Sequence, residues 1–156
     1  MIFHILMNQM TILFLSLNLL TTLSFDSEIE SYLYGGSPEE MFFQVTGNNK
    51  TLALRPRTEG GFSNLLVITK NRKYYFDLKY DKANPHQFIE VKDGVMNHAL
   101  TKKLKTSDFE ILEGDNSILF MNLKSAEVDV NGVKVKHQEY FSKGVPIISE
   151  GRRILN

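Results

Sequence analysis

Histidines and carboxylates are the side chains of this sequence that can act as acids, bases or metal ligands, but their spacing matches no catalytic or metal-binding pattern. Beyond residue 24 the histidines are His86, His98 and His137, and no short ligand-type interval connects them. Four carboxylates lie close together and can in principle serve a hydrolase: Asp108, Glu110, Glu113 and Asp115. They flank an expected strand edge and turn, where solvated charges are common. We therefore expect structural or surface histidines, no catalytic residue and no metal ligand.

The other charged and glycine-rich positions favour neither a cofactor nor a nucleic acid. The glycines lack the adjacent Lys and Ser or Thr of a phosphate-binding loop, so no cofactor is expected. The 18 basic and 18 acidic residues cancel, which removes the electrostatic attraction that direct nucleic-acid binding needs. Lys102, Lys103 and Lys105 fit a solvated face better than a contact with a membrane or a partner. Because the chain has no cysteine, its core alone must hold it together.

The clearest structural element is a β-hairpin over residues 64 to 78. An apolar run is followed by a short polar break and then by residues that alternate between apolar and polar. Lys70 and Asn71 suit a two-residue turn in the middle of the break. The core face then pairs these residues across the hairpin: Leu65 with Phe76, and Val67 with Tyr74.

The opposite face of the same hairpin carries Leu66, Ile68 and Tyr75. That is more apolar surface than a strand pair with one face in water normally presents. We therefore expect the hairpin to lie inside a sandwich or against a partner. Leu66, Ile68 and Tyr75 are the candidate partner interface.

Turn residues separate short strand-like runs at intervals of about eight to twelve residues, which predicts a mostly β fold. We expect one or more antiparallel β-sandwich-like domains built of short strands and hairpins. A second hairpin turns at Asn131 and Gly132, the strongest turn signal of the chain. It sets these residues against each other: Val128 and Val135, Val130 and Val133. Pro85 and its polar neighbours in residues 81 to 86 mark the expected boundary between two β units.

The start of the chain predicts the compartment. Residues 10 to 23 are mainly apolar and lead into a polar sequence, as in a secretory signal cleaved between Ser24 and Phe25. The run is shorter than the ~20 residues that a spanning helix needs. No Lys or Arg precedes it, which a true start at Met7 or Met10 would explain. We expect the segment to be removed and the protein to be periplasmic; the alternatives are an uncleaved membrane anchor and a buried core helix.

Residues 38 to 81 contain an ordered series of short motifs. A strand ends in a leucine and a proline; a loop, an Asn-led apolar strand, a turn with Thr and Arg, and a Tyr-x-Phe-x-Leu strand follow. The residues at these places are Leu54, Pro56, Asn64, Thr69, Arg72, Tyr74, Phe76 and Leu78. In order and spacing they resemble the amino-terminal domain of the TrbG/CagX family, conjugal-transfer proteins of type IV secretion systems.

The resemblance implies a non-enzymatic structural subunit that scaffolds an envelope-spanning secretion channel. Its implied partners are further copies of the chain in a homo-oligomeric ring, a bitopic inner-membrane channel protein and a small outer-membrane lipoprotein. The domain organisation would be a signal peptide in residues 1 to 24, a TrbG/CagX-like β domain in residues 25 to 82, and a β-rich second half in residues 87 to 156. This second half can belong to the same domain as residues 25 to 82 or form one of its own. The second half does not match the lipoprotein-binding domain of the family, so lipoprotein binding is not carried over with it.

Two other classes of protein share some of these features. A periplasmic binding module of a secretin or a pilus-assembly protein has short strands of the same kind and different partners. A secreted hydrolase needs a concave site in which polar groups converge and carboxylates have perturbed pKa values.

Overall fold

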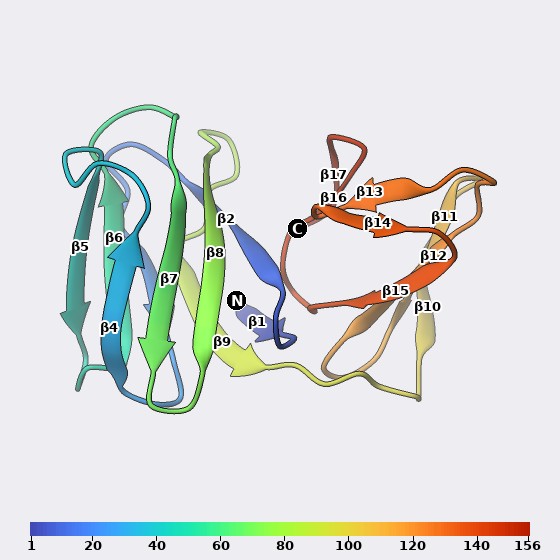
Figure 1. Ribbon diagram of the computed structural model, residues 1–156, viewed down its shortest axis with the longest axis horizontal. Coiled ribbons are helices and arrows are strands. Elements are labelled where there is room, and N and C mark those ends of the chain that lie inside the picture. The colour runs from blue at the N-terminus through green and yellow to red at the C-terminus, as the bar shows by residue number, and fades with distance from the viewer. The chain divides into compact units, whose positions relative to one another are not determined.

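The computed structural model describes Met1–Asn156 and is built entirely from strands and their connections, without any helix. It contains no helix long and apolar enough to cross a membrane. The chain divides into two compact units. The first unit comprises Met1–Ile2 and Met10–Lys92, and the second comprises Phe3–Gln9 and Asp93–Asn156 (Figure 1). The mostly β, sandwich-like class expected from the sequence is confirmed.

The first unit contains two sheets that pack face to face. One has the order β2-β8-β7-β4 and the other contains the order β9-β3-β6-β5. Their bounds are β2 (Met10–Leu15), β3 (Thr21–Ser24), β4 (Ile29–Tyr34), β5 (Met41–Thr46), β6 (Thr51–Pro56), β7 (Asn64–Thr69), β8 (Lys73–Tyr80) and β9 (Phe88–Asp93), whose last residue belongs to the second unit. Phe43 of β5 contacts the rings of Tyr32 and Tyr34 of β4 at 5.2 and 5.4 Å, so aromatic side chains join the two sheets.

The predicted β7–β8 hairpin is confirmed with its register. Leu65 pairs with Phe76 and Val67 with Tyr74, and all four side chains are buried. The turn forms because the hydroxyl of Thr69 accepts hydrogen bonds from the backbone N–H groups of Asn71 and Arg72, at 3.3 and 3.2 Å. The alternation of apolar and polar residues thus decides which face enters the core.

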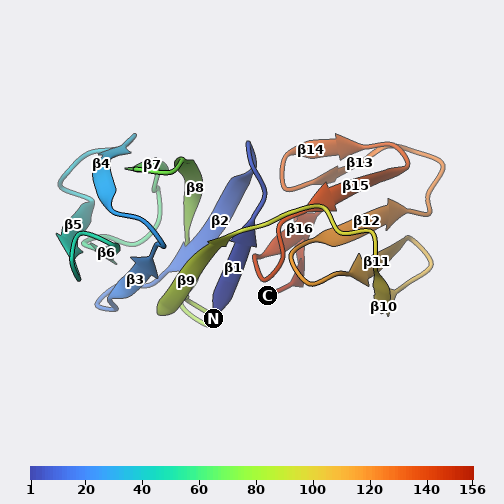
Figure 2. The same cartoon turned by 90° about the horizontal axis from the view of Figure 1, so that it is seen from below.

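Two strand pairs of the first unit are parallel, which the antiparallel expectation did not include. β2 runs parallel to β8, and β3 runs parallel to β9; Figure 2 shows β3 and β9 beside each other. Parallel partners must be joined by a long connection. Here the whole of β3 to β7 separates β2 from β8 along the chain. A pairing over such a distance leaves no local pattern in the sequence.

The segment expected to be a signal peptide forms strands in both units. β2, β3 and the connection between them take residues 10 to 24, and β1 (Ile2–Ile5) starts in the first unit and continues in the second. Leu13, Leu15 and Leu23 are completely buried. β3 lies between β9 and β6, with neighbours on both sides. Cleavage after Ser24 would therefore remove an interior strand of this sheet. The removal of the segment stays a prediction.

The second unit also contains two four-stranded sheets. One has the order β10-β11-β12-β15 and the other the order β14-β13-β16-β17. The bounds are β10 (Thr101–Lys105), β11 (Phe109–Glu113), β12 (Ile118–Asn122), β13 (Val128–Val130), β14 (Val133–Val135), β15 (Gln138–Phe141), β16 (Ile147–Ser149) and β17 (Arg152–Leu155). The β13–β14 hairpin has the predicted register, since Val128 pairs with Val135 and Val130 with Val133. Asn131 and Gly132 form its turn with φ angles of 51° and 82°.

The N-terminal residues Phe3–Gln9 belong to the second unit through specific hydrogen bonds. His4 exchanges two backbone hydrogen bonds with Lys143, of 2.8 and 3.0 Å. The buried backbone N–H of Leu6 donates to the hydroxyl of Ser142 at 2.9 Å. The side chain of Gln9 donates to the carbonyl of Tyr140 at 2.8 Å. The chain thus starts in the first unit, contributes Phe3–Gln9 to the second unit and returns to the first unit at Met10.

The chain passes for the last time from the first unit to the second between Lys92 and Asp93. This division lies later than the boundary expected in residues 81 to 86. The reason is that residues 88 to 92 still belong to a strand of the first unit, β9, which pairs with β3.

Candidate functional site

The outer face of the sheet β2-β8-β7-β4 carries a row of apolar side chains, one from each strand. Met10 of β2 pairs with Tyr75 of β8, Tyr75 pairs with Leu66 of β7, and Leu66 pairs with Leu33 of β4. Side chains directly opposite each other on neighbouring strands point to the same face. Met10, Tyr75, Leu66 and Leu33 therefore form a continuous line across the sheet, which we call the apolar row.

The apolar row is open to water. Leu33 is 63% exposed, Met10 is 42% exposed and Tyr75 is 39% exposed, while Leu66 is half-buried between its neighbours. Isolated apolar side chains on a surface are ordinary, but four in register across a sheet are a contiguous patch. Such a patch gains free energy when a partner removes it from water.

Polar and charged groups border the apolar row. Beyond Leu66, Ile68 is half-buried and pairs with Lys73 on one side and Ser31 on the other. On the other side of the row, Asn64 pairs with Asp77. An apolar centre with a polar border is the usual composition of a protein–protein contact surface.

The structure brings together the three interface residues predicted from the sequence. Leu66, Ile68 and Tyr75 share one face of the β7–β8 hairpin, opposite the core pairs. Sequence reasoning did not include Leu33 and Met10. The pairing of β4 with β7 is long-range, and the sequence predicts that Met10 lies in a leader.

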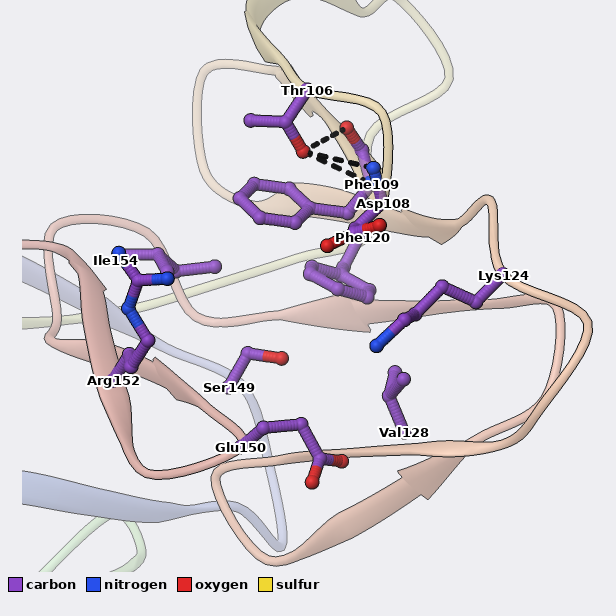
Figure 3. A pocket seen from close by; sticks show the side chains of 10 residues that line it. All are labelled: Thr106, Asp108, Phe109, Phe120, Lys124, Val128, Ser149, Glu150, Arg152 and Ile154. Atoms are coloured by element: carbon purple, nitrogen blue, oxygen red, sulfur yellow. Dashed lines mark hydrogen bonds between the residues drawn. The ribbon is translucent and has the colours of Figure 1, made fainter.

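The second unit contains a cavity of about 330 Å³. Its residues come from both sheets and from their connections: Thr106, Asp108, Phe109, Phe120, Lys124, Val128, Ser149, Glu150, Arg152 and Ile154 (Figure 3). The rings of Phe109 and Phe120 stack, with centroids 5.5 Å apart and planes at 21°. Together with Val128 and Ile154 they give the cavity apolar walls.

Four charged side chains line the same cavity. Glu150 already accepts a hydrogen bond of 2.7 Å from the backbone N–H of Asp129. Lys124, Arg152 and Asp108 are exposed, and their charged groups form no hydrogen bond or ion pair with another residue of the chain. Figure 3 shows the ammonium of Lys124 and the hydroxyl of Ser149 directed into the cavity. Of these residues, only Asp108 belonged to a group identified from the sequence.

The histidines do not converge on a site. His86 is buried, and its Nδ1 accepts a hydrogen bond of 2.9 Å from the backbone N–H of Phe14. The backbone N–H of His86 donates to the carbonyl of Phe14 at 2.8 Å, so His86 pairs with the outer edge of β2. His98 and His137 are exposed. No three His, Cys, Asp or Glu side chains lie close enough together to hold a metal ion.

The acidic group of the sequence is divided among different contacts. Glu110 forms an ion pair with Lys102 at 3.5 Å, and Glu113 forms ion pairs with Lys103 at 2.8 Å and Lys143 at 3.1 Å. The hydrogen bond from Lys103, followed by that from Lys143, holds the pKa of the Glu113 carboxyl below its usual value, although partial burial opposes the shift. A general acid of a hydrolase needs the opposite shift.

In the first unit, the side chains of Tyr34 and Glu40 form a polar contact. The hydroxyl of Tyr34 donates a hydrogen bond of 2.6 Å to Glu40 and accepts one of 3.2 Å from the backbone N–H of Ser63. Partial burial and the bond to Glu40 raise the pKa of Tyr34 above its ordinary value, although the bond from Ser63 opposes this. The hydroxyl therefore stays protonated and ties β4 to the loop before β7.

Comparison of the sequence with models of known protein families gives no match, and comparison with curated protein sequences gives none either. The resemblance of residues 38 to 81 to the TrbG/CagX family therefore stays a prediction.

Proposed function

We propose that this protein is a non-enzymatic structural subunit of an envelope-spanning type IV secretion channel, of the TrbG/CagX kind. It would scaffold the periplasmic core complex by protein–protein contact, in a ring with further copies of itself and beside an inner-membrane channel protein. The apolar row of the first unit carries the proposal. A scaffold needs rigid surfaces that neighbours can cover, and this row crosses a complete sheet in register.

The alternative functions differ in what they require of the molecule. A secretin or pilus-assembly module would use the same kind of surface with other partners, so the identity of the bound proteins separates it from the first proposal. A hydrolase would need two carboxylates with different roles around one cleft. Glu110 and Glu113 are instead held by lysines. We therefore favour a binding role over an enzymatic one.

Leu33→Lys tests the role of the apolar row. Leu33 is the most exposed member of the row, so the variant should fold like the wild type. A charge at a contact that becomes desolvated costs several kcal/mol. Co-purification of the tagged protein with envelope partners should therefore fall at least about tenfold.

Phe88→Lys is the matched control for that experiment, because Phe88 is an equally apolar residue, 71% exposed, on the other sheet of the first unit. It should co-purify with the same partners as the wild type. Partners that bind Leu33→Lys as well as wild type would show that the apolar row is not the interface. Recovery of pilin or secretin components in place of conjugation components would favour the alternative module.

The periplasmic location is part of the same proposal and has its own measurement. A chain cut after Ser24 lacks β1, β2 and β3, including Met10 of the apolar row. Such a chain therefore differs from the folded units described above, which include these three strands. Amino-terminal sequencing of the protein from the envelope fraction distinguishes them: a start at Phe25 supports a cleaved leader, and a start before Phe3 supports a structural role of the segment.

A further inference from the structure

We propose that the cavity of the second unit binds an acidic segment of a partner protein. One bulky apolar side chain of that segment would lie against Phe109 and Phe120, and a neighbouring carboxylate would pair with Lys124 or Arg152. This inference rests on the proposed scaffolding function and adds the chemistry of a partner to it.

The size and walls of the cavity fit one large side chain. A volume of about 330 Å³ lies at the lower end of the roughly 300–1,000 Å³ of small-molecule sites. Phe120 is buried and Phe109 half-buried, so the stacked rings form a fixed apolar surface. Pockets that receive a single aromatic or aliphatic anchor are the usual hot spots of protein interfaces.

Each of the two cations of the cavity can bind a carboxylate. Lys124 and Arg152 supply two cations without a partner in the chain, and the Ser149 hydroxyl adds a donor that no acceptor of the chain engages. Two carboxylates also line the cavity: Asp108, which has no contact, and Glu150, which accepts a hydrogen bond from the neutral backbone N–H of Asp129. A carboxylate beside Lys124 or Arg152 would gain a charge-assisted hydrogen bond that the free protein does not make.

The rim of the cavity favours a peptide over a small molecule. Asp108, Lys124 and Arg152 are all exposed, whereas small-molecule sites usually enclose most of the ligand surface. Arg152 and Ile154 belong to β17, which is the last strand in the order of its sheet. An extended segment can add to such an edge while its side chain enters the cavity beside it.

Fluorescence anisotropy with three labelled nonapeptides tests the inference on the full chain. The first peptide has a phenylalanine flanked on each side by two glutamates; the second replaces the phenylalanine by alanine; the third replaces the glutamates by lysines. The first peptide should bind at least about tenfold more tightly than either of the others, and its affinity should fall as salt is raised.

Lys124→Glu and Arg152→Glu provide the matched variants. Each should weaken binding of the first peptide about five- to tenfold, because each places a like charge against the glutamates. Lys136→Glu makes the same change on an exposed lysine that does not line the cavity, and should bind as the wild type does. Thermal melts followed by circular dichroism verify that all three variants fold.

The remaining outcomes each contradict the inference. Equal binding of the three peptides, or unchanged binding by both Lys124→Glu and Arg152→Glu, would overturn it. Competition by 3-phenylpropionate at the same affinity as the first peptide would assign the cavity to a small carboxylic acid instead. If the peptides fail to bind while Leu33→Lys still abolishes co-purification with envelope partners, only the cavity assignment is wrong and the scaffolding function stands.

Discussion

Single side chains decide which faces of the strands are internal. In β8, Tyr75 is 39% exposed on the apolar row, whereas its neighbour Phe76 is completely buried opposite Leu65. Phe76 also contacts the ring of Phe25 at 6.4 Å in an edge-to-face arrangement. The two residues are adjacent in sequence and lie on opposite faces of the sheet, Phe76 in the core and Tyr75 at the surface.

Phe76→Ala should lower the free energy of unfolding by roughly 3 to 5 kcal/mol, because it leaves a cavity between Leu65 and Phe25. Urea denaturation of the purified variant measures the loss. Tyr75→Ala, one residue away on the open face, is the control and should cost far less. A loss below about 1 kcal/mol for Phe76→Ala would mean that its side chain is not buried and that the register is wrong.

At the level of elements, hairpins could be predicted and long-range pairings could not. The β7–β8 and β13–β14 hairpins have local causes: alternation of apolar residues and short turns at Lys70–Asn71 and Asn131–Gly132. The parallel pairing of β2 with β8 has no local cause. When that pairing is not known, the composition of an apolar segment followed by small polar residues does not distinguish a strand from a signal peptide.

In the candidate sites, too, residues brought together by one hairpin could be predicted, and residues brought together by long-range pairing could not. Leu66, Ile68 and Tyr75 were predictable because one hairpin fixes their common face. Leu33 and Met10 complete the apolar row only through β4 and β2, whose partners the sequence does not indicate. The cavity of the second unit depends on Phe109 and Ser149, which are far apart along the chain, and on the packing of their two sheets.

Gly132→Ala tests the turn of the β13–β14 hairpin. Gly132 has a φ of 82°, and a Cβ there would meet no atom within 4 Å. The cost should therefore come from the backbone alone and amount to about 1 kcal/mol. Lys134→Ala removes an exposed ion pair with Asp129 from the same hairpin and should cost less in parallel urea melts. A cost of several kcal/mol for Gly132→Ala would reveal a contact that the turn does not show.

At the scale of the whole molecule, the N-terminal segment contributes residues to both units, so the stability of each unit depends on this segment. Residues 3 to 9 bond to β15 and the residues after it, while residues 10 to 24 supply β2 and β3 to the first unit. Each unit is therefore discontinuous in sequence. A change near the N-terminus is expected to weaken the second unit, although most of that unit begins at Asp93.

Ser142→Ala tests this connection, because it removes the acceptor of the buried Leu6 N–H. An unsatisfied buried N–H costs about 1–3 kcal/mol. Hydrogen exchange should therefore become faster at Leu6 and His4 than in the wild type. Ser149→Ala removes a hydroxyl of the same unit that has no partner and should leave these amides unchanged. Unchanged exchange at Leu6 in Ser142→Ala would show that the segment is not held by this bond.

The place of Phe3–Gln9 in the second unit also sets the order of events on the ribosome. Leu6 and its partner Ser142 are 136 residues apart, and synthesis at roughly 5–20 residues per second separates them by about 7–27 seconds. The first unit has all its own residues once Lys92 has left the exit tunnel, whereas the second must wait for the residues up to Asn156. During that interval Phe3, Ile5 and Leu6, all buried in the finished protein, are exposed on the nascent chain. The segment lacks its hydrogen-bonding partners until Ser142 and Lys143 have been synthesised.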